Sequence, residues 1–85
     1  MNSTMPKLTL DLIKDKIGEP TNYDVHFIED KEIGHSYYHL LVFGNLKLHI
    51  AEYLDGEYYI NTLIGKGFMY DSLEEAIVKI NELIK

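Results

Sequence analysis

The sequence predicts one α+β domain: an N-terminal helix, an antiparallel sheet of three or four strands, and a C-terminal amphipathic helix packed on one sheet face. Two tight-turn signals, Gly44-Asn45 and Asp55-Gly56, separate stretches that alternate as strands do, which is typical of a meander with two hairpins. The stretch from Leu73 to Lys85 has helical spacing instead. A chain of 85 residues fits a single domain, so we expect residues 1–85 to fold as one unit with residues 1–5 frayed.

The first helix is predicted over Pro6 to Ile17. Proline suits a first helical position. The segment has an apolar stripe at helical spacing, formed by Leu10, Ile13 and Ile17. Gly18 and Pro20 then end the helix.

Four stretches are predicted as strands: Tyr23–Glu29, Ser36–Phe43, Leu46–Leu54 and Glu57–Ile64. A glycine at the first central position of a two-residue loop favours a type II′ turn at Gly44-Asn45. Asp55-Gly56 is typical of a type I′ turn. We expect Gly65-Lys66-Gly67 to break the last strand, because glycines commonly bend a strand there; the motif lacks the Lys-Ser or Lys-Thr ending of a phosphate loop.

Two-residue loops would fix which side chains share a sheet face. The first face would carry Tyr37, His39, Leu41, Leu48, Ile50, Glu52 and Tyr59. The second face would carry Tyr38, Leu40, Val42, His49, Tyr53, Tyr58, Ile60 and Ile64. The C-terminal helix covers only one face, so we expect the first helix or a second chain to cover the other, which is too apolar to be fully hydrated.

The C-terminal helix has the clearest local signals. Ser72 is a good N-cap, and Glu75 follows at capping-box spacing. One apolar stripe runs along it, formed by Leu73, Ala76, Ile77, Ile80, Leu83 and Ile84. The acidic residues Asp71, Glu74 and Glu75 complement the helix dipole, which is a structural explanation for their position.

Charge argues against direct nucleic-acid binding. The net charge is −6, with 14 acidic residues against eight lysines and no arginine, whereas nucleic-acid binders usually present a basic face. An acidic surface suits a basic protein partner. The chain has no cysteine, no apolar stretch long enough to span a membrane, and no signal-peptide core at Met1–Lys7. We therefore expect a cytoplasmic protein that does not contact membranes.

The sequence carries no motif for catalysis, a cofactor or a metal. His39 and His49 point to opposite faces in the predicted register, which argues against a shared metal site, and a hydrogen-bonded histidine at position 39 is the expected role. Asp24 and His26 share a strand face, but no activated nucleophile accompanies them. We therefore expect no cofactor, no metal and no enzymatic activity.

Tyrosines and loop acids form the candidate partner surface. The seven tyrosines concentrate in the sheet and its exit, and tyrosine is enriched at protein interfaces as well as in strands. The candidate partner-binding residues are Glu29, Asp30, Glu32, Tyr38, Tyr53, Asp55, Glu57 and Tyr58. Acids in this set would contact a basic partner or imitate a nucleic-acid backbone.

Two family resemblances arise from the pattern. The helix–strands–helix order resembles a double-stranded-RNA-binding domain, although the last helix begins with an acidic stretch, Ser72 to Ala76, where that domain has lysines. The passage from Asp71 to Ile77 is similar to the strand-to-helix passage of HicB-type antitoxins and covers less than a quarter of the chain. No functional residue is transferred from either family.

The leading functional hypothesis is a small acidic, non-catalytic protein-binding module. It would be an inhibitor or accessory protein of the kind that phages and mobile elements encode, acting on a basic nucleic-acid-handling protein. The alternative is a homodimeric structural or regulatory protein, similar to an antitoxin.

Overall fold

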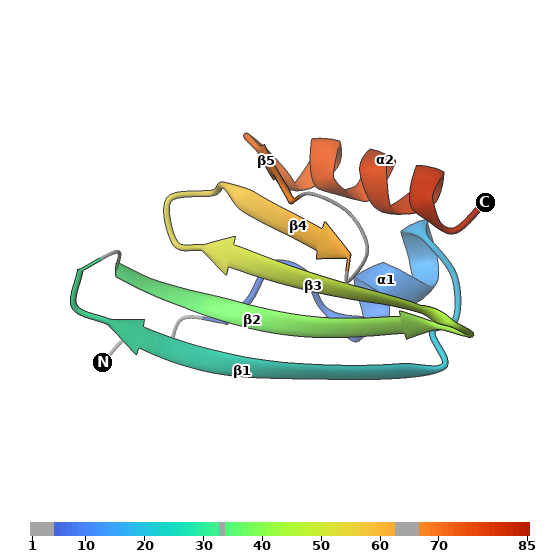
Figure 1. The fold of residues 1–85 in the computed structure, drawn as a ribbon, viewed down its shortest axis with the longest axis horizontal. Helices are drawn as coiled ribbons and strands as arrows, with labels where there is room; N and C mark the ends of the chain where they lie inside the picture. The colour runs from blue at the N-terminus through green and yellow to red at the C-terminus, as the bar shows by residue number, and fades with distance from the viewer. Residues whose placement is uncertain (1–4, 33, 63–66) are drawn as a thin grey trace.

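The computed structural model describes residues 5–32, 34–62 and 67–85. In these ranges the chain forms α1 (Leu10–Lys16), β1 (Asn22–Asp30), β2 (Gly34–Phe43), β3 (Leu46–Tyr53), β4 (Tyr58–Thr62), β5 (Phe68–Tyr70) and α2 (Leu73–Leu83) (Figure 1). The described strands make one antiparallel sheet of five, in the order β1-β2-β3-β4-β5. The α+β class and the antiparallel meander are thus confirmed. The expected fraying at positions 1–5 falls mainly outside the described residues.

The helix α1 begins later than predicted. Thr9 is its N-cap, and the Thr9 hydroxyl accepts a hydrogen bond from the Leu12 N–H at 3.2 Å. The first N–H groups of a helix have no carbonyl partner within it, and a threonine side chain accepts a hydrogen bond from one of them. A proline side chain has no acceptor for this purpose. Leu8 therefore lies before the helix, where it is fully buried in the core.

The first hairpin has the predicted geometry. Phe43 pairs with Leu46, so the loop contains only Gly44 and Asn45. Gly44 has φ +62°, and no residue other than glycine has a positive φ among the described residues. A positive φ at the first central position alone defines the type II′ turn.

The second hairpin differs from the prediction by one residue. The Tyr53 N–H donates to the Glu57 carbonyl at 2.9 Å, and the Gly56 N–H donates to the Tyr53 carbonyl at 3.0 Å. The loop therefore holds three residues, ending in Gly56 with φ +101°. A type I turn followed by a glycine in the left-handed region is the usual three-residue hairpin loop, and it fits Asp-Gly as well as a type I′ turn does.

This extra loop residue reverses the faces of β4. Ile50 pairs with Ile60 and Glu52 with Tyr58, so Tyr58 and Ile60 lie on the first face. Tyr59 and Asn61 lie on the second face, opposite Ala51 and His49. The predicted placement of Tyr58, Tyr59 and Ile60 was wrong, because a slip of one residue moves every side chain of a strand to the other face. Ile64 lies outside the described residues.

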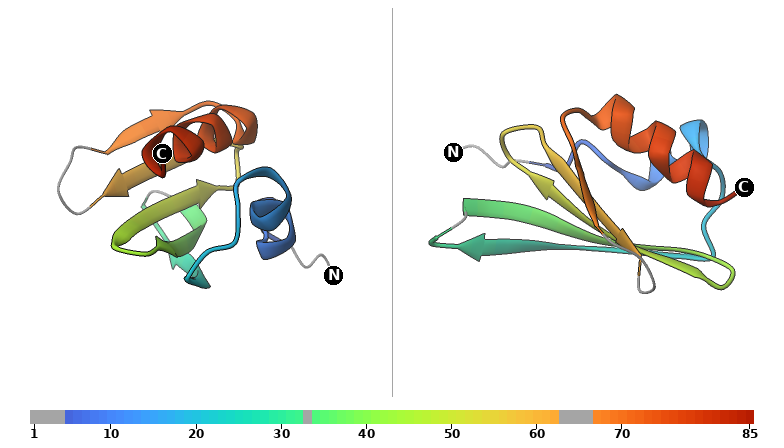
Figure 2. Two further views of the ribbon diagram at one scale, coloured as in Figure 1. Left: turned by 90° about the vertical axis from the view of Figure 1, so that its right-hand side faces the viewer. Right: turned by 45° about the horizontal axis from the view of Figure 1, so that its top comes forward.

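Both helices pack on the first face. One buried cluster joins side chains from α1, α2, the segment before α1 and three strands: Leu8, Ile13, Leu41, Leu48, Ile50, Tyr58, Ile60, Ala76 and Ile80. The Asn81 side-chain amide of α2 donates to the Lys16 carbonyl at the end of α1, at 3.1 Å. Figure 2 shows the two helices on the same side of the twisted sheet. The hypothesis that α1 covers the second face was therefore wrong.

Phe68–Tyr70, which the sequence predicted only as the approach to the C-terminal helix, form the strand β5. Its residues pair with β4, with Phe68 opposite Ile60 and Tyr70 opposite Tyr58. The helix α2 then begins as predicted: the Ser72 hydroxyl accepts from the Glu75 N–H at 3.2 Å. It ends at Leu83, two residues before the predicted end. Among the described residues, neither helix has the length and apolar content needed to cross a membrane.

Candidate functional site

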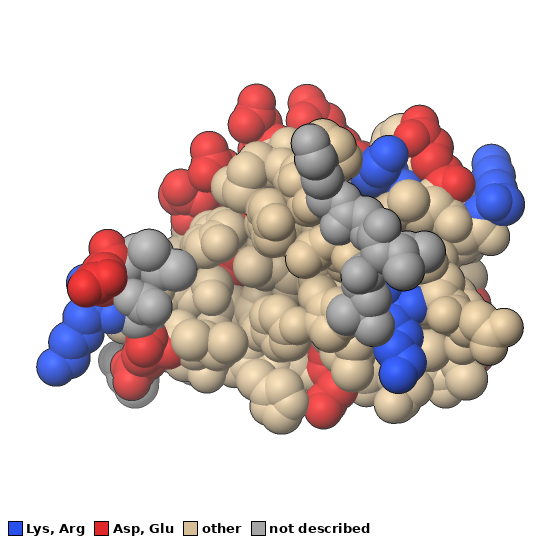
Figure 3. All heavy atoms as spheres, in the orientation of Figure 1, with Lys and Arg blue, Asp and Glu red and all other residues tan. Residues whose placement is uncertain are grey.

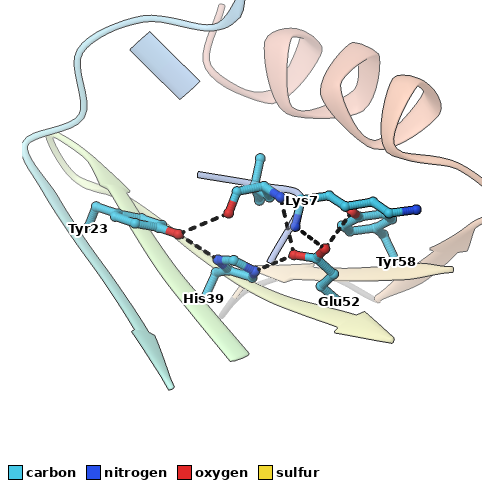
Figure 4. Close-up of polar contacts among 6 residues, drawn as sticks. Lys7, Tyr23, His39, Glu52 and Tyr58 are labelled. Carbon is cyan, nitrogen blue, oxygen red and sulfur yellow. Dashed lines mark hydrogen bonds and ion pairs between the residues drawn. The ribbon is translucent and has the colours of Figure 1, made fainter. Parts of the chain in front are cut away.

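A buried polar network lies between the sheet and the segment that precedes α1 (Figure 4). Its centre is the Glu52 carboxylate, which accepts four hydrogen bonds. Oε1 accepts from His39 Nε2 at 2.9 Å and from the Leu8 N–H at 3.3 Å. Oε2 accepts from the Lys7 N–H at 2.7 Å and from the Tyr58 hydroxyl at 2.9 Å. His39 is 0% exposed, Glu52 4% and Tyr58 1%, so the network belongs to the core.

Strand register brings the network together. Glu52 on β3 faces Tyr58 on β4, and this pairing exists only because the second hairpin has a three-residue loop. His39 on β2 lies opposite Ile50, so it is a diagonal neighbour of Glu52 on the same face. The Lys7 and Leu8 N–H groups arrive from 45 and 44 residues away in the sequence.

Tyr23 on β1 extends the network to a fourth strand. Its hydroxyl oxygen lies 2.8 Å from His39 Nδ1 and 3.3 Å from the Leu8 carbonyl oxygen. A hydroxyl has one proton to donate. It therefore donates to only one of these two acceptors at a time, and the contact with His39 Nδ1 runs in either direction depending on which ring nitrogen carries the proton.

The network sets the ionisation of its members. Burial by itself raises the pKa of the Glu52 carboxyl, but hydrogen bonds from His39, the Lys7 N–H and Tyr58 outweigh it and hold that pKa below 4.5. Burial, followed by the negative charge of Glu52, raises the pKa of Tyr23 to about 12. The same two causes raise the pKa of Tyr58. Burial and the charge of Glu52 thus both favour the protonated form of the two neighbouring tyrosines.

This network is a structural element. The order Tyr23, His39, Glu52 imitates a proton relay, but a catalytic group must touch its substrate, and His39 has no exposed surface. The carboxylate accepts from two backbone N–H groups of the segment before α1, and the Leu8 N–H among them would otherwise be buried without this partner. The expected hydrogen-bonded role of His39 fits this arrangement.

The other histidines are dispersed. His26 Nε2 lies 3.1 Å from Asp24 Oδ2 on an exposed part of β1, the neighbouring pair expected from the sequence. His49 Nδ1 contacts the Tyr38 hydroxyl on the second face, and His49 Nε2 and Asn61 Oδ1 are buried there with no hydrogen-bond partner among the described residues. In the part of the chain that the structure describes, no cluster of three or more acidic or histidine side chains has a geometry that suits a metal ion.

The predicted partner-binding residues fall into separate places. Glu29 and Glu32 are exposed near the turn from β1 to β2, where Asp30 pairs with Gly34. Tyr53 and Asp55 line a hollow of about 220 Å³ at the same end of the sheet, with Gly34, His35 and Leu54. Tyr38 lies on the second face.

Three of these residues make hydrogen bonds within the protein, and one of the three is buried. Asp55 Oδ1 accepts from the Glu57 N–H at 3.0 Å, so this acidic pair is part of the turn. Tyr58 lies in the core, and its hydroxyl is bound to Glu52. Tyr58 therefore has no surface to offer a partner, which corrects its place in the predicted set.

A larger hollow lies along the outer side of α2, beside the end of β5. We call it the α2–β5 groove; its volume is about 360 Å³, and it is lined by Tyr70, Glu74, Glu75, Val78, Lys79 and Glu82. Val78 in its lining is 58% exposed, and the neighbouring strand β5 exposes Phe68, at 55%, and Met69, at 50%, outside the lining. In Figure 3 acidic atoms follow the upper margin of the molecule, where α2 and β5 run in Figure 1. Apolar surface and carboxylates thus occur together at this edge.

Sequence reasoning missed the apolar part of this groove. The acids at the start of α2 were explained by capping, and the capping contacts are present, since the Glu75 carboxylate accepts from the Asp71 N–H at 3.3 Å. Two of these acids, Glu74 and Glu75, nevertheless line the groove. Val78, an apolar residue off the buried stripe of its helix, was the available signal.

Comparison with protein-family models, with curated proteins and with solved structures finds no match to this chain.

Proposed function

We propose that this chain is a non-catalytic protein-binding module that recognises a basic segment of its partner at the α2–β5 groove. The observation that carries the proposal is that the lining of one groove combines apolar surface, from Tyr70 and Val78, with the carboxylates of Glu74, Glu75 and Glu82. Interfaces commonly combine buried apolar anchors with a polar rim in this way.

The charge of the groove supports a basic partner. Three carboxylates line it against one amine, and Lys79 already lies 3.9 Å from Glu82. Single exposed ion pairs contribute only about 0.2–1 kcal/mol each. The carboxylates would therefore mainly attract the basic partner and discriminate against other partners, while the apolar contacts supply most of the binding free energy. The net charge of −6 adds long-range attraction for a cationic partner.

Proteins that handle nucleic acids present such basic surfaces, and they are the partner class that we propose. Binding there would block the basic surface of the partner. The chain would then act as an inhibitor or accessory protein, of the kind that phages and mobile elements encode.

A displayed library of random heptapeptides tests the proposal. The wild-type protein should enrich peptides that combine lysine or arginine with apolar residues, and the Val78→Asp and Glu74→Lys variants should each lose that enrichment. Glu29→Lys is the matched control, because it makes the same charge change at an exposed site outside the groove lining. Equal loss in the control would show non-specific attraction and exclude the groove. No enrichment by the wild type would refute the proposed function.

A homodimer is the second candidate. Its support is the second face, which has no helix packed on it in the described parts of the chain and appears largely uncharged in Figure 3. Light scattering decides it: a strict monomer at about 100 µM excludes even weak association at the micromolar level.

A further inference from the structure

We infer that the partner segment binds as an extended strand along the outer edge of β5, so that its side chains on one side enter the α2–β5 groove. This inference rests on the proposed function and specifies how the same site is occupied. Strand addition to a sheet edge is a common way to bind a peptide, because the backbone hydrogen bonds need no particular sequence.

The edge itself is the first support. In the strand order β5 is terminal, and none of the described strands pairs with its outer side. An edge strand presents a row of N–H and C=O groups that can pair with another chain.

The contrast between the two edges is the second support. The other edge strand, β1, exposes Asp24, His26 and Glu29, and charged side chains on an edge oppose pairing with another chain. The strand β5 reads Phe-Met-Tyr, with no charge and no proline, and two of its three side chains are exposed. Both edge strands expose apolar side chains, since Phe27 and Ile28 of β1 are also exposed, but of the two edges in the described part of the chain only the short β5 edge has no charged side chain.

Side-chain alternation connects this edge to the groove. Tyr70 pairs with Tyr58 and so lies on the first face, where it lines the groove together with Val78 of α2. In a strand added beside β5, every second side chain would point to this same face. The groove therefore selects an apolar residue flanked, two positions away on either side, by basic residues that reach the carboxylates of Glu74 and Glu82.

A designed heptapeptide provides the probe. Its sequence is Thr-Lys-Thr-Val-Thr-Lys-Thr with blocked ends, which places lysine, valine and lysine on one side of a strand. Two modified forms carry methyl groups on the backbone nitrogens, either of Lys-Val-Lys or of the threonines between them. Alternate N–H groups of an added strand point toward β5 and away from it, so only one of these two forms keeps the N–H groups that face β5.

Fluorescence anisotropy with the full chain measures the three affinities. We expect the parent peptide to bind and one methylated form to lose at least about tenfold in affinity, which corresponds to one or two hydrogen bonds. The other form should stay within about twofold of the parent, a factor well below one hydrogen bond. Amide exchange should also slow within Phe68–Tyr70 when the parent peptide binds.

The outcomes separate the two proposals. If both methylated forms bind like the parent, or both lose affinity equally, strand addition is refuted while the groove remains the binding site. If the parent does not bind although the displayed library yields groove-dependent basic peptides, strand addition is again refuted alone. If the library yields none, the proposed function fails first.

Discussion

The imidazole Nε2 of His39 lies 2.9 Å from the carboxylate Oε1 of Glu52, in a part of the core where His39 is wholly enclosed. The two side chains come from β2 and β3 and together hold the segment before α1 on the sheet through the Lys7 and Leu8 N–H groups. Breaking a buried pair is costly because the remaining partner stays buried without its counterpart.

Replacing Glu52 by glutamine should therefore destabilise the fold. The amide has one acceptor oxygen, so at least one pair of donors among His39, Leu8, Lys7 and Tyr58 would face an NH₂ group. We expect Glu52→Gln to lower the free energy of unfolding at pH 7 by about 2–4 kcal/mol, measured by urea unfolding. Glu29→Gln, an exposed control, should change it by less than about 0.5 kcal/mol. A Glu52→Gln effect as small as that of the control would show that the network contributes little.

Lowering the pH should remove the contribution of the Glu52 carboxylate to the stability of the fold. Its pKa lies below the ordinary 4.5 in the folded state, so the ionised carboxyl stabilises the fold above about pH 4.5. This contribution is lost as the pH falls through the folded-state pKa. The difference in unfolding free energy between wild type and Glu52→Gln should thus shrink in urea unfolding experiments as the pH is lowered from 6 to below 4.5. A difference independent of pH would contradict the assigned ionisation.

The two tyrosine hydroxyls should differ in importance. Tyr58 donates to a buried carboxylate, and hydrogen bonds to charged groups contribute about 1.5–3 kcal/mol, so Tyr58→Phe should cost that much. Tyr23 contacts an imidazole and a carbonyl from a partly exposed position, so Tyr23→Phe should cost about 0.5–1.5 kcal/mol. Thermal and urea unfolding of both variants measure the order. A larger loss of stability for Tyr23→Phe than for Tyr58→Phe would indicate that the hydrogen bonds of His39 contribute more than those of Glu52.

Leu8 should matter more than any apolar residue on the outer side of α1. It is fully buried although it precedes the helix, whereas Leu10, in the helix and on the predicted stripe, is 37% exposed. We expect Leu8→Ala to cost about 2–5 kcal/mol by removal of core contacts, and Leu10→Ala less than about 1 kcal/mol. Similar losses for the two variants would mean that the segment before α1 is not held on the sheet as described.

Gly56 tests the loop that sets the register of β4. Its φ of +101° is strained for any residue with a Cβ atom. Gly56→Ala should lower stability by about 1–2 kcal/mol, while Asp55, with a negative φ, should tolerate alanine with the loss of only one turn hydrogen bond, about 0.5–1.5 kcal/mol. A type I′ turn would require a positive φ at both positions. A larger loss at Asp55 than at Gly56 would therefore favour the two-residue loop.

Local signals were sufficient for several elements, although they missed β5 and placed the start of α1 too early. The N-cap at Ser72, the type II′ turn at Gly44 and the alternation of β2 and β3 each depend on residues a few positions apart, and all three occur as predicted. The sequence did not predict the groove. Its acidic residues were explained by capping, and its apolar residues lie on two elements whose packing against each other cannot be predicted from local patterns.

The sequence by itself determined the α+β class, the meander and the start of the last helix, since hydrophobic period and turn chemistry are properties of short segments. Only the tertiary structure decided that Tyr58 turns inward to Glu52, that both helices share one face and that Phe68–Tyr70 closes the sheet as an edge. The physical reason is that Asp-Gly allows two loop lengths, and the hydrogen bond of Tyr58 with Glu52 and the burial of Ile60 in the shared core fit only the longer one.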